Sequence, residues 1–145
     1  MSRLEEILTD LDAEAARLDA LVAPLDEEDW STPTLAAGWD VAHQIAHLAW
    51  TDWSALMAAT DKVAWDEIVE RAIVDPHGFV DTAAAAGAAE PGLLARWRDG
   101  RAALAEALRA LPDGARLPWY GPPMSAASMA TARFMETWAH GRDVA

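Results

Sequence analysis

In this 145-residue sequence, three of the four histidines and one glutamate stand in two pairs with helical spacing. His43 and His47 are four residues apart, and so are Glu136 and His140. Residues four apart lie on one face of an α-helix, separated by ~6 Å along its axis. If two such helices lie side by side with these faces inward, two imidazoles and a carboxylate meet around one point.

Histidine and glutamate side chains form catalytic zinc sites, in which three protein ligands leave one position open for water or substrate. Nitrogen and oxygen donors also suit nickel, iron and manganese, so the donors alone do not identify the metal. A divalent cation would offset the cost of burying these polar groups together. The alternative is a helical protein in which the same groups are scattered and each is satisfied separately. The spacing leaves both interpretations open.

Helical periodicity predicts the helices on which these residues lie. Ser2 and Glu5 form a capping-box pattern ahead of an apolar repeat that ends before Pro24. Asp40 and Ser125 are N-cap candidates for two further helices. Four long helices are therefore predicted over residues 4–22, 41–60, 91–111 and 126–145.

The connecting segments are shorter and less regular. Residues 62–74 have a weaker helical pattern, which Asp75 and Pro76 end. Residues 81–90 are alanine-rich with a glycine in the middle, so helix and loop both remain open for this segment. Pro91 suits a first helical position. Loops are predicted over residues 25–39, with room for one helical turn, and 112–124. Four long helices with such connections predict an all-α four-helix bundle, in one domain over residues 1–145.

Composition excludes several function classes. With 24 acidic against 11 basic residues, the net charge of −13 disfavours nucleic acid as a partner. The absence of cysteine excludes disulfides, cysteine zinc ligands and cysteine nucleophiles. No stretch is long and apolar enough for a membrane span, and the N-terminus lacks a signal-peptide pattern, so we expect a cytoplasmic protein. Serine-hydrolase, phosphate-loop and H-E-x-x-H motifs are missing, which leaves metal-assisted chemistry.

Two motifs resemble those of a known family. GWDVAHQIAHLAWTD at residues 38–52 and PWYGPPMSAASMATARFMETWAHGRDVA at residues 118–145 are similar to the mycothiol-dependent maleylpyruvate isomerase metal-binding domain family, in the DinB-like superfamily. The resemblance implies a DinB-like bundle in which His47, Glu136 and His140 bind the metal.

Two further polar residues lie close to these ligands in sequence. His43 stands where many relatives of the isomerase have an aspartate, so its role does not transfer. It is predicted as a fourth ligand, as a donor behind a ligand, or as a residue lining the cleft. Asp143 is predicted either to orient an imidazole or to be a solvated acid at a helix end.

A substrate pocket is predicted beside the metal. Arg133 could hold a substrate carboxylate through a bidentate contact, or pair with a neighbouring acid. The aromatic residues that are either pocket walls or core residues are Trp50, Trp119, Tyr120 and Trp138. The remaining tryptophans are predicted to anchor helices and loops to the core: Trp30, Trp39, Trp53, Trp65 and Trp97.

The resemblance implies an enzyme in which a divalent ion binds an external small thiol such as mycothiol. Zinc is the first expectation, with nickel, iron and manganese as alternatives. The metal lowers the pKa of the thiol, and the thiolate attacks an electrophilic small substrate, as in an isomerase or S-transferase. The alternatives are a hydrolase using metal-activated water and a metal-binding module without catalysis. The isomerase has a further C-terminal domain, so the sequence could be the N-terminal part of a longer protein, as a monomer or homodimer.

Overall fold

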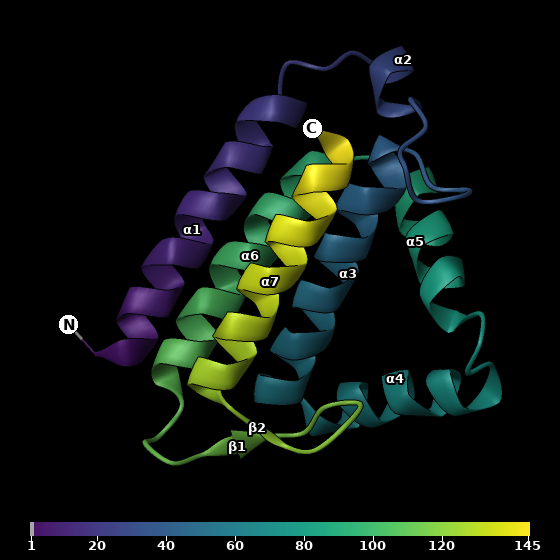
Figure 1. Ribbon diagram of the computed structural model, residues 1–145. Coiled ribbons are helices and arrows are strands. Elements are labelled where there is room, and N and C mark those ends of the chain that lie inside the picture. Colours follow the sequence, from purple (N-terminus) through teal and green to yellow (C-terminus); the bar gives the residue numbers. More distant parts are fainter. Residues whose placement is uncertain (1) are drawn as a thin grey trace.

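The computed structural model describes residues 2–145, and four long helices form a bundle within it (Figure 1). Helix α3 is central, because it contacts α6 and α7 of the bundle as well as α4 and α5. The predicted all-α four-helix bundle is confirmed. The long helices are α1 (Arg3–Val22), α3 (Val41–Thr60), α6 (Leu93–Ala110) and α7 (Ala126–Val144).

The predicted N-caps begin three of these helices. Side-chain oxygens of Ser2, Asp40 and Ser125 each accept a hydrogen bond from a backbone N–H three residues further on. These bonds satisfy amide groups that have no partner inside the helix. Asp61 separates α3 from the helix that follows. Its side chain accepts a hydrogen bond from the backbone N–H of Ala64 and so caps the start of that following helix. The start of α7, which carries Glu136 and His140, is therefore fixed by its own sequence.

The shorter elements are the helices α2 (Glu27–Trp30), α4 (Lys62–Val74) and α5 (Phe79–Ala89) and the strands β1 (Arg116–Leu117) and β2 (Met124–Ser125). Helix α2 is the single turn expected between the first two long helices. Residues 81–90, for which the sequence left helix and loop open, are mostly helical, as part of α5.

Two details of the connections differ from the predictions. Pro91 lies outside α6, because Gly92 adopts φ +75° and serves as the N-cap ahead of Leu93. A positive φ suits glycine, which has no Cβ to clash. Strands β1 and β2 pair antiparallel inside a predicted loop. Strands of two residues are too short to show an alternating pattern.

The core has two apolar clusters at the two ends of the bundle. Ile45 and Trp97 belong to one cluster, and Leu104 and Met129 belong to the other. Buried polar side chains of α3 and α7 form a polar layer beside and between these clusters: Gln44, His47, Thr51, Asp52, Ser54, Arg133 and Thr137. Burying polar groups costs free energy unless they are paired. A protein that keeps several of them in its interior is expected to use them, so this layer is the first place to look for a functional site.

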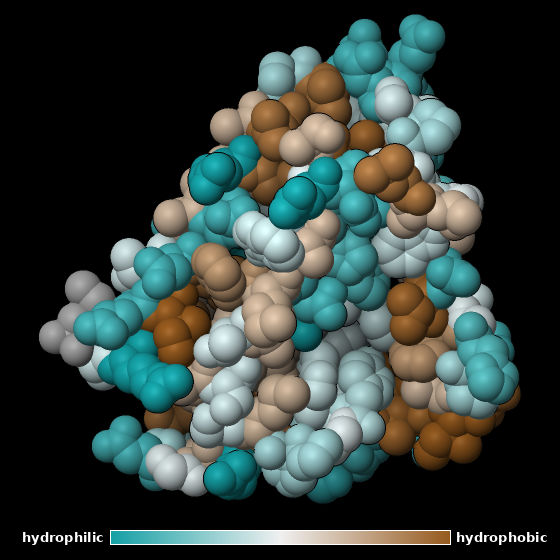
Figure 2. All heavy atoms as spheres, in the orientation of Figure 1, coloured by the Kyte–Doolittle hydropathy of each residue, from teal (hydrophilic) through white to brown (hydrophobic). Residues whose placement is uncertain are grey.

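Apolar side chains also reach the surface. Figure 2 shows hydrophobic side chains gathered near the junction of α4 and α5, where Ile73 and Val74 are 71% and 85% exposed. Trp53 is 40% exposed, so the prediction that it anchors α3 to the core is wrong. No helix within residues 2–145 has the length and hydropathy of a membrane-spanning segment.

Candidate metal centre

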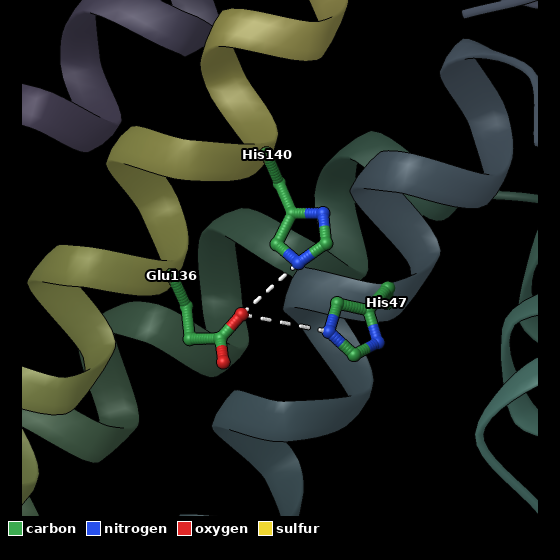
Figure 3. A group of neighbouring side chains, drawn as sticks. All are labelled: His47, Glu136 and His140. Atoms are coloured by element: carbon green, nitrogen blue, oxygen red, sulfur yellow. Dashed lines mark ion pairs between the residues drawn. The ribbon is translucent and has the colours of Figure 1, made fainter. Parts of the chain in front are cut away.

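His47, Glu136 and His140 converge between α3 and α7 (Figure 3). One potential ligand atom from each residue lies within 4.8 Å of the other two. Oε2 of Glu136 is 3.0 Å from Nε2 of His140 and 3.7 Å from Nε2 of His47. The two helices therefore bring together the three residues that the resemblance implies as ligands.

The second nitrogens of the two imidazoles have different surroundings. Nδ1 of His140 lies 2.6 Å from Oε1 of Gln44, a fully buried side chain of α3. Nδ1 of His47 is buried and has no hydrogen-bond partner among residues 2–145. A bond to the second nitrogen decides which nitrogen of an imidazole can bind a metal.

The electrostatics of the site favour an ionised carboxylate. When Nε2 of His140 and then Nε2 of His47 carry protons, their hydrogen bonds hold the pKa of Glu136 well below its ordinary value, and the positive charge of Arg133 acts in the same direction. Partial burial opposes this shift. Glu136 therefore supplies a negative charge at the centre of the site.

The donor set fits a divalent cation. A carbonyl oxygen only accepts hydrogen bonds, so the proton of a neutral His140 lies on Nδ1, facing Gln44. Its Nε2 then directs a lone pair at the Glu136 carboxylate, 3.0 Å away. Two acceptors at this distance repel each other unless a proton or metal ion lies between them. His47, Glu136 and His140 are the residues that would hold such an ion.

His43 and Asp143 lie outside this group. The ring Nδ1 of His43 is 2.7 Å from Oδ1 of Asp40, and its backbone N–H donates to the same oxygen at the start of α3. This imidazole thus belongs to the capping box of α3. Asp143 is half-buried in the last turn of α7. The three-residue group contains neither of them.

Trp39 lies against the imidazoles, a position that the sequence did not indicate. Its ring centroid is 5.2 Å from that of His47 and 6.0 Å from that of His140. Its indole Nε1 donates to Asp81 of α5 at 3.1 Å. The sequence predicted Trp39 as a core anchor, because a tryptophan ahead of a helix start carries no pattern that distinguishes contact with a site from packing in the core.

An aromatic cluster continues from the site along α3. Trp50 is 6.4 Å from His47 and 6.3 Å from Tyr120 between ring centroids. Tyr120 also contacts Trp119, at 4.9 Å, and its hydroxyl donates to Ser54. We call the following five residues the aromatic cluster: Trp50, Trp65, Phe79, Trp119 and Tyr120. Three of the four predicted pocket aromatics therefore lie together, and Trp50 joins them to His47.

Trp138 is the exception, because the structure does not bring it into the predicted pocket. Positions 138 and 140 lie ~200° apart around a helix, so the two side chains point to different faces. Trp138 is 48% exposed and lies beneath the guanidinium of Arg142, beside Leu21 of α1.

Arg133 contacts Trp119 of the aromatic cluster and lies one turn before Glu136 on α7. It is 4% exposed, and its guanidinium carbon is 5.1 Å from the centre of the Trp119 ring. Nε and Nη1 have no hydrogen-bond partner within residues 2–145. Burial lowers the pKa of Arg133, while the charge of Asp52 and then that of Glu136 oppose the shift. Arg133 therefore places a buried positive charge next to the site.

The fold and the site define a DinB-like helical bundle with a histidine and glutamate cluster between two of its helices. Residues 11–145 match the family described as the mycothiol maleylpyruvate isomerase N-terminal domain, and the chain belongs to this family.

Curated relatives also match this chain. Two uncharacterized proteins of Mycobacterium tuberculosis, from strains CDC 1551 / Oshkosh and ATCC 25618 / H37Rv, are each 56% identical to this chain over 140 residues. The alignments cover 95% of this chain and 54% of each relative. The chain thus spans about half the length of the relatives that it matches.

Solved structures show the same fold. A crystal structure of the mycothiol-dependent maleylpyruvate isomerase superposes with a TM-score of 0.75 at 18% identity, covering 97% of this chain and 60% of that chain. A histidine-to-alanine mutant of that enzyme superposes with a TM-score of 0.76 at 20% identity, with the same coverage.

Proposed function

We propose that this chain is the metal-binding domain of a thiol-dependent enzyme. His47, Glu136 and His140 hold a divalent cation, with zinc as the first expectation. The observation that carries this proposal is the convergence of three ligand atoms within 4.8 Å, from helices far apart in sequence. The close approach of Glu136 and His140 supports it, because a cation bound between the two groups would take the place of the proton that otherwise joins them.

A divalent ion held here would lower the pKa of a bound thiol, so that the thiolate is present at neutral pH. The residues of the chain prepare the site for this chemistry. Glu136 presents a negative charge to the site. The His140 ring is held by its hydrogen bond with Gln44 and by its stacking against Trp39. The aromatic cluster, through Trp50, offers a surface beside His47 for the apolar part of a substrate.

The thiol is proposed to be an external small molecule of the mycothiol type. The sequence contains no cysteine, so a sulfur nucleophile has to come from outside the chain. Mycothiol is named both in the description of the family and in that of the solved isomerase, and isomerisation or S-transfer to an electrophilic small molecule follows as the proposed reaction. The cytoplasm, where thiols stay reduced, is the proposed location.

Cobalt substitution tests the thiol step directly. Adding mycothiol to the cobalt-loaded protein is expected to produce a sulfur-to-cobalt charge-transfer band in the near ultraviolet. S-methylated mycothiol is the matched control, since it keeps the sugar groups but cannot form a thiolate. No spectral change at millimolar mycothiol would contradict the proposal and favour a metal-dependent hydrolase or a non-catalytic metal-binding module.

A further inference from the structure

Gln44 connects the two helices that carry the candidate ligands. It lies on α3, three residues before His47, and its side chain is fully buried. Its Oε1 is 2.6 Å from Nδ1 of His140 on α7, and its Nε2 is 3.1 Å from Oγ1 of Thr34. The amide therefore uses both of its ends in hydrogen bonds between separate segments.

The hydrogen bond of Thr34 fixes the orientation of this amide. The Thr34 hydroxyl donates its single hydrogen to the backbone carbonyl of Trp39 at 2.8 Å. It can therefore only accept from Gln44, and the NH₂ group of the amide must face Thr34. The carbonyl oxygen of Gln44 consequently faces His140, where it can only accept.

We propose that Gln44 is a positioning residue that holds His140 in the tautomer with the proton on Nδ1. Nε2, which faces Glu136, is then left free to bind a cation. This inference rests on the proposed metal-binding function for its purpose, although the tautomer itself is a property of the metal-free protein. Within residues 2–145 His47 has no such partner, so the positioning acts on one of the two imidazoles.

The same chain of hydrogen bonds places Trp39 on the His140 ring. The Trp39 carbonyl accepts from both the backbone N–H and the hydroxyl of Thr34. Its indole lies 24° from parallel to the His140 imidazole. Gln44 thus fixes the ring through a hydrogen bond at its edge, and the loop held by Thr34 covers the ring face.

Three variants test the role of Gln44 through zinc affinity, measured by competition with a chromophoric chelator. Gln44→Met keeps the side-chain volume without the acceptor and is expected to weaken zinc binding by ~10–100-fold, as for other residues that orient a ligand. Gln44→Glu keeps an acceptor oxygen facing His140 and is expected to retain most of the affinity that Gln44→Met loses. Thr34→Val removes the constraint on the amide and should give an intermediate loss.

Thr131→Val is the matched control, because this hydroxyl bonds only within α7 at an exposed position. It is expected to leave zinc affinity unchanged. Circular dichroism and thermal unfolding of every variant establish that the bundle remains folded.

Long-range ¹H–¹⁵N NMR of the metal-free protein at pH 8 provides the second readout. The wild type is expected to show His140 protonated on Nδ1, and Gln44→Met is expected to lose this preference. An unchanged tautomer in Gln44→Met would overturn the inference, whether or not zinc affinity falls. If the wild type binds no zinc, the proposed function fails, and the tautomer measurement still decides the role of Gln44.

Discussion

Asp52 is a buried carboxylate in the polar layer between the two apolar clusters. It is 7% exposed and lines a cavity of about 210 Å³ together with Arg101 and Thr137. Burial raises its pKa to about 7, although the positive charges of Arg133 and Arg101 act in the opposite direction. The folded protein therefore binds a proton here that the unfolded chain releases near pH 4.

Asp52→Asn is expected to stabilise the protein at alkaline pH. Because the folded pKa lies above the unfolded one, wild-type stability from this group is complete below about pH 4 and is lost as the pH rises towards 7. The variant lacks this loss, so its advantage should grow between pH 5 and 8, by on the order of 2–4 kcal/mol. Urea unfolding at several pH values measures it.

Asp10→Asn, at an exposed position of α1, is the control and should show no comparable gain. A difference between Asp52→Asn and wild type that stays constant from pH 5 to 8 would contradict the assignment of Asp52 as a buried titrating group.

The residue types at the candidate site were largely predictable, and their supporting contacts were not. Histidine and glutamate at a spacing of four marked two helix faces, and the family motifs implied which residues bind the metal. Gln44, Trp39 and Asp52 gave no comparable signal. Their importance comes from contacts across segments, such as the bond of Gln44 to His140, 96 positions away.

At the scale of elements, the start of α3 sets the position of His47. Asp40 accepts from the His43 backbone at 2.8 Å, and the His43 ring contacts the same carboxylate. This reciprocal cap explains why a histidine lies in the first turn without joining the three-residue group.

Asp40→Ala is expected to lower the free energy of unfolding by about 1 kcal/mol, because the first turn of α3 loses its cap. Urea denaturation measures the change. Asp29→Ala, in the exposed single turn of α2, is the comparison and should cost less. Equal stability of Asp40→Ala and wild type would show that the cap does not support α3.

Helix α5 shows where periodicity fails to predict an element. Its alanine-rich sequence has no clear apolar stripe, and Gly87 lies in its last turns. A Cβ at Gly87 would lie 3.1 Å from Cβ of Ala46, so α5 and α3 approach closely at this point. This packing on α3, which the local sequence does not contain, decides that the segment is helical.

At the scale of the whole molecule, acidic charge exceeds basic charge by 13. Some of the basic residues join α1 to α6 across the bundle: Arg98 and Arg101 contact Asp19, and Arg109 contacts Glu5. The basic residues are too few to pair with every acidic side chain, so repulsion between like charges opposes folding.

Raising the NaCl concentration from 10 to 200 mM is expected to raise the Tm of the metal-free protein, because salt screens this repulsion over a Debye length that falls to below ~10 Å. Scanning calorimetry in a chelator-containing buffer measures the effect. Arg98→Ala should enlarge it, since the variant is more acidic. A Tm that falls with salt would indicate that the ion pairs across α1 and α6 outweigh the net charge.

The overall architecture was the most predictable property of the molecule. Caps at Ser2, Asp40 and Ser125 and four long apolar repeats define a helical bundle without help from long-range contacts. The family match agrees with this architecture over residues 11–145. The chain covers 54% of its curated relatives, so the activity of the whole proteins stays a proposal for this domain.

Metal analysis of protein purified without a chelator or affinity tag tests whether His47, Glu136 and His140 bind a metal ion. The wild type is expected to contain close to one divalent ion per chain, and His47→Ala and His140→Ala are expected to contain none. His77→Ala removes an exposed histidine outside the three-residue group and should keep the ion. A wild type without metal after incubation with zinc, or full occupancy in His47→Ala or His140→Ala, would show that these residues do not form the metal site.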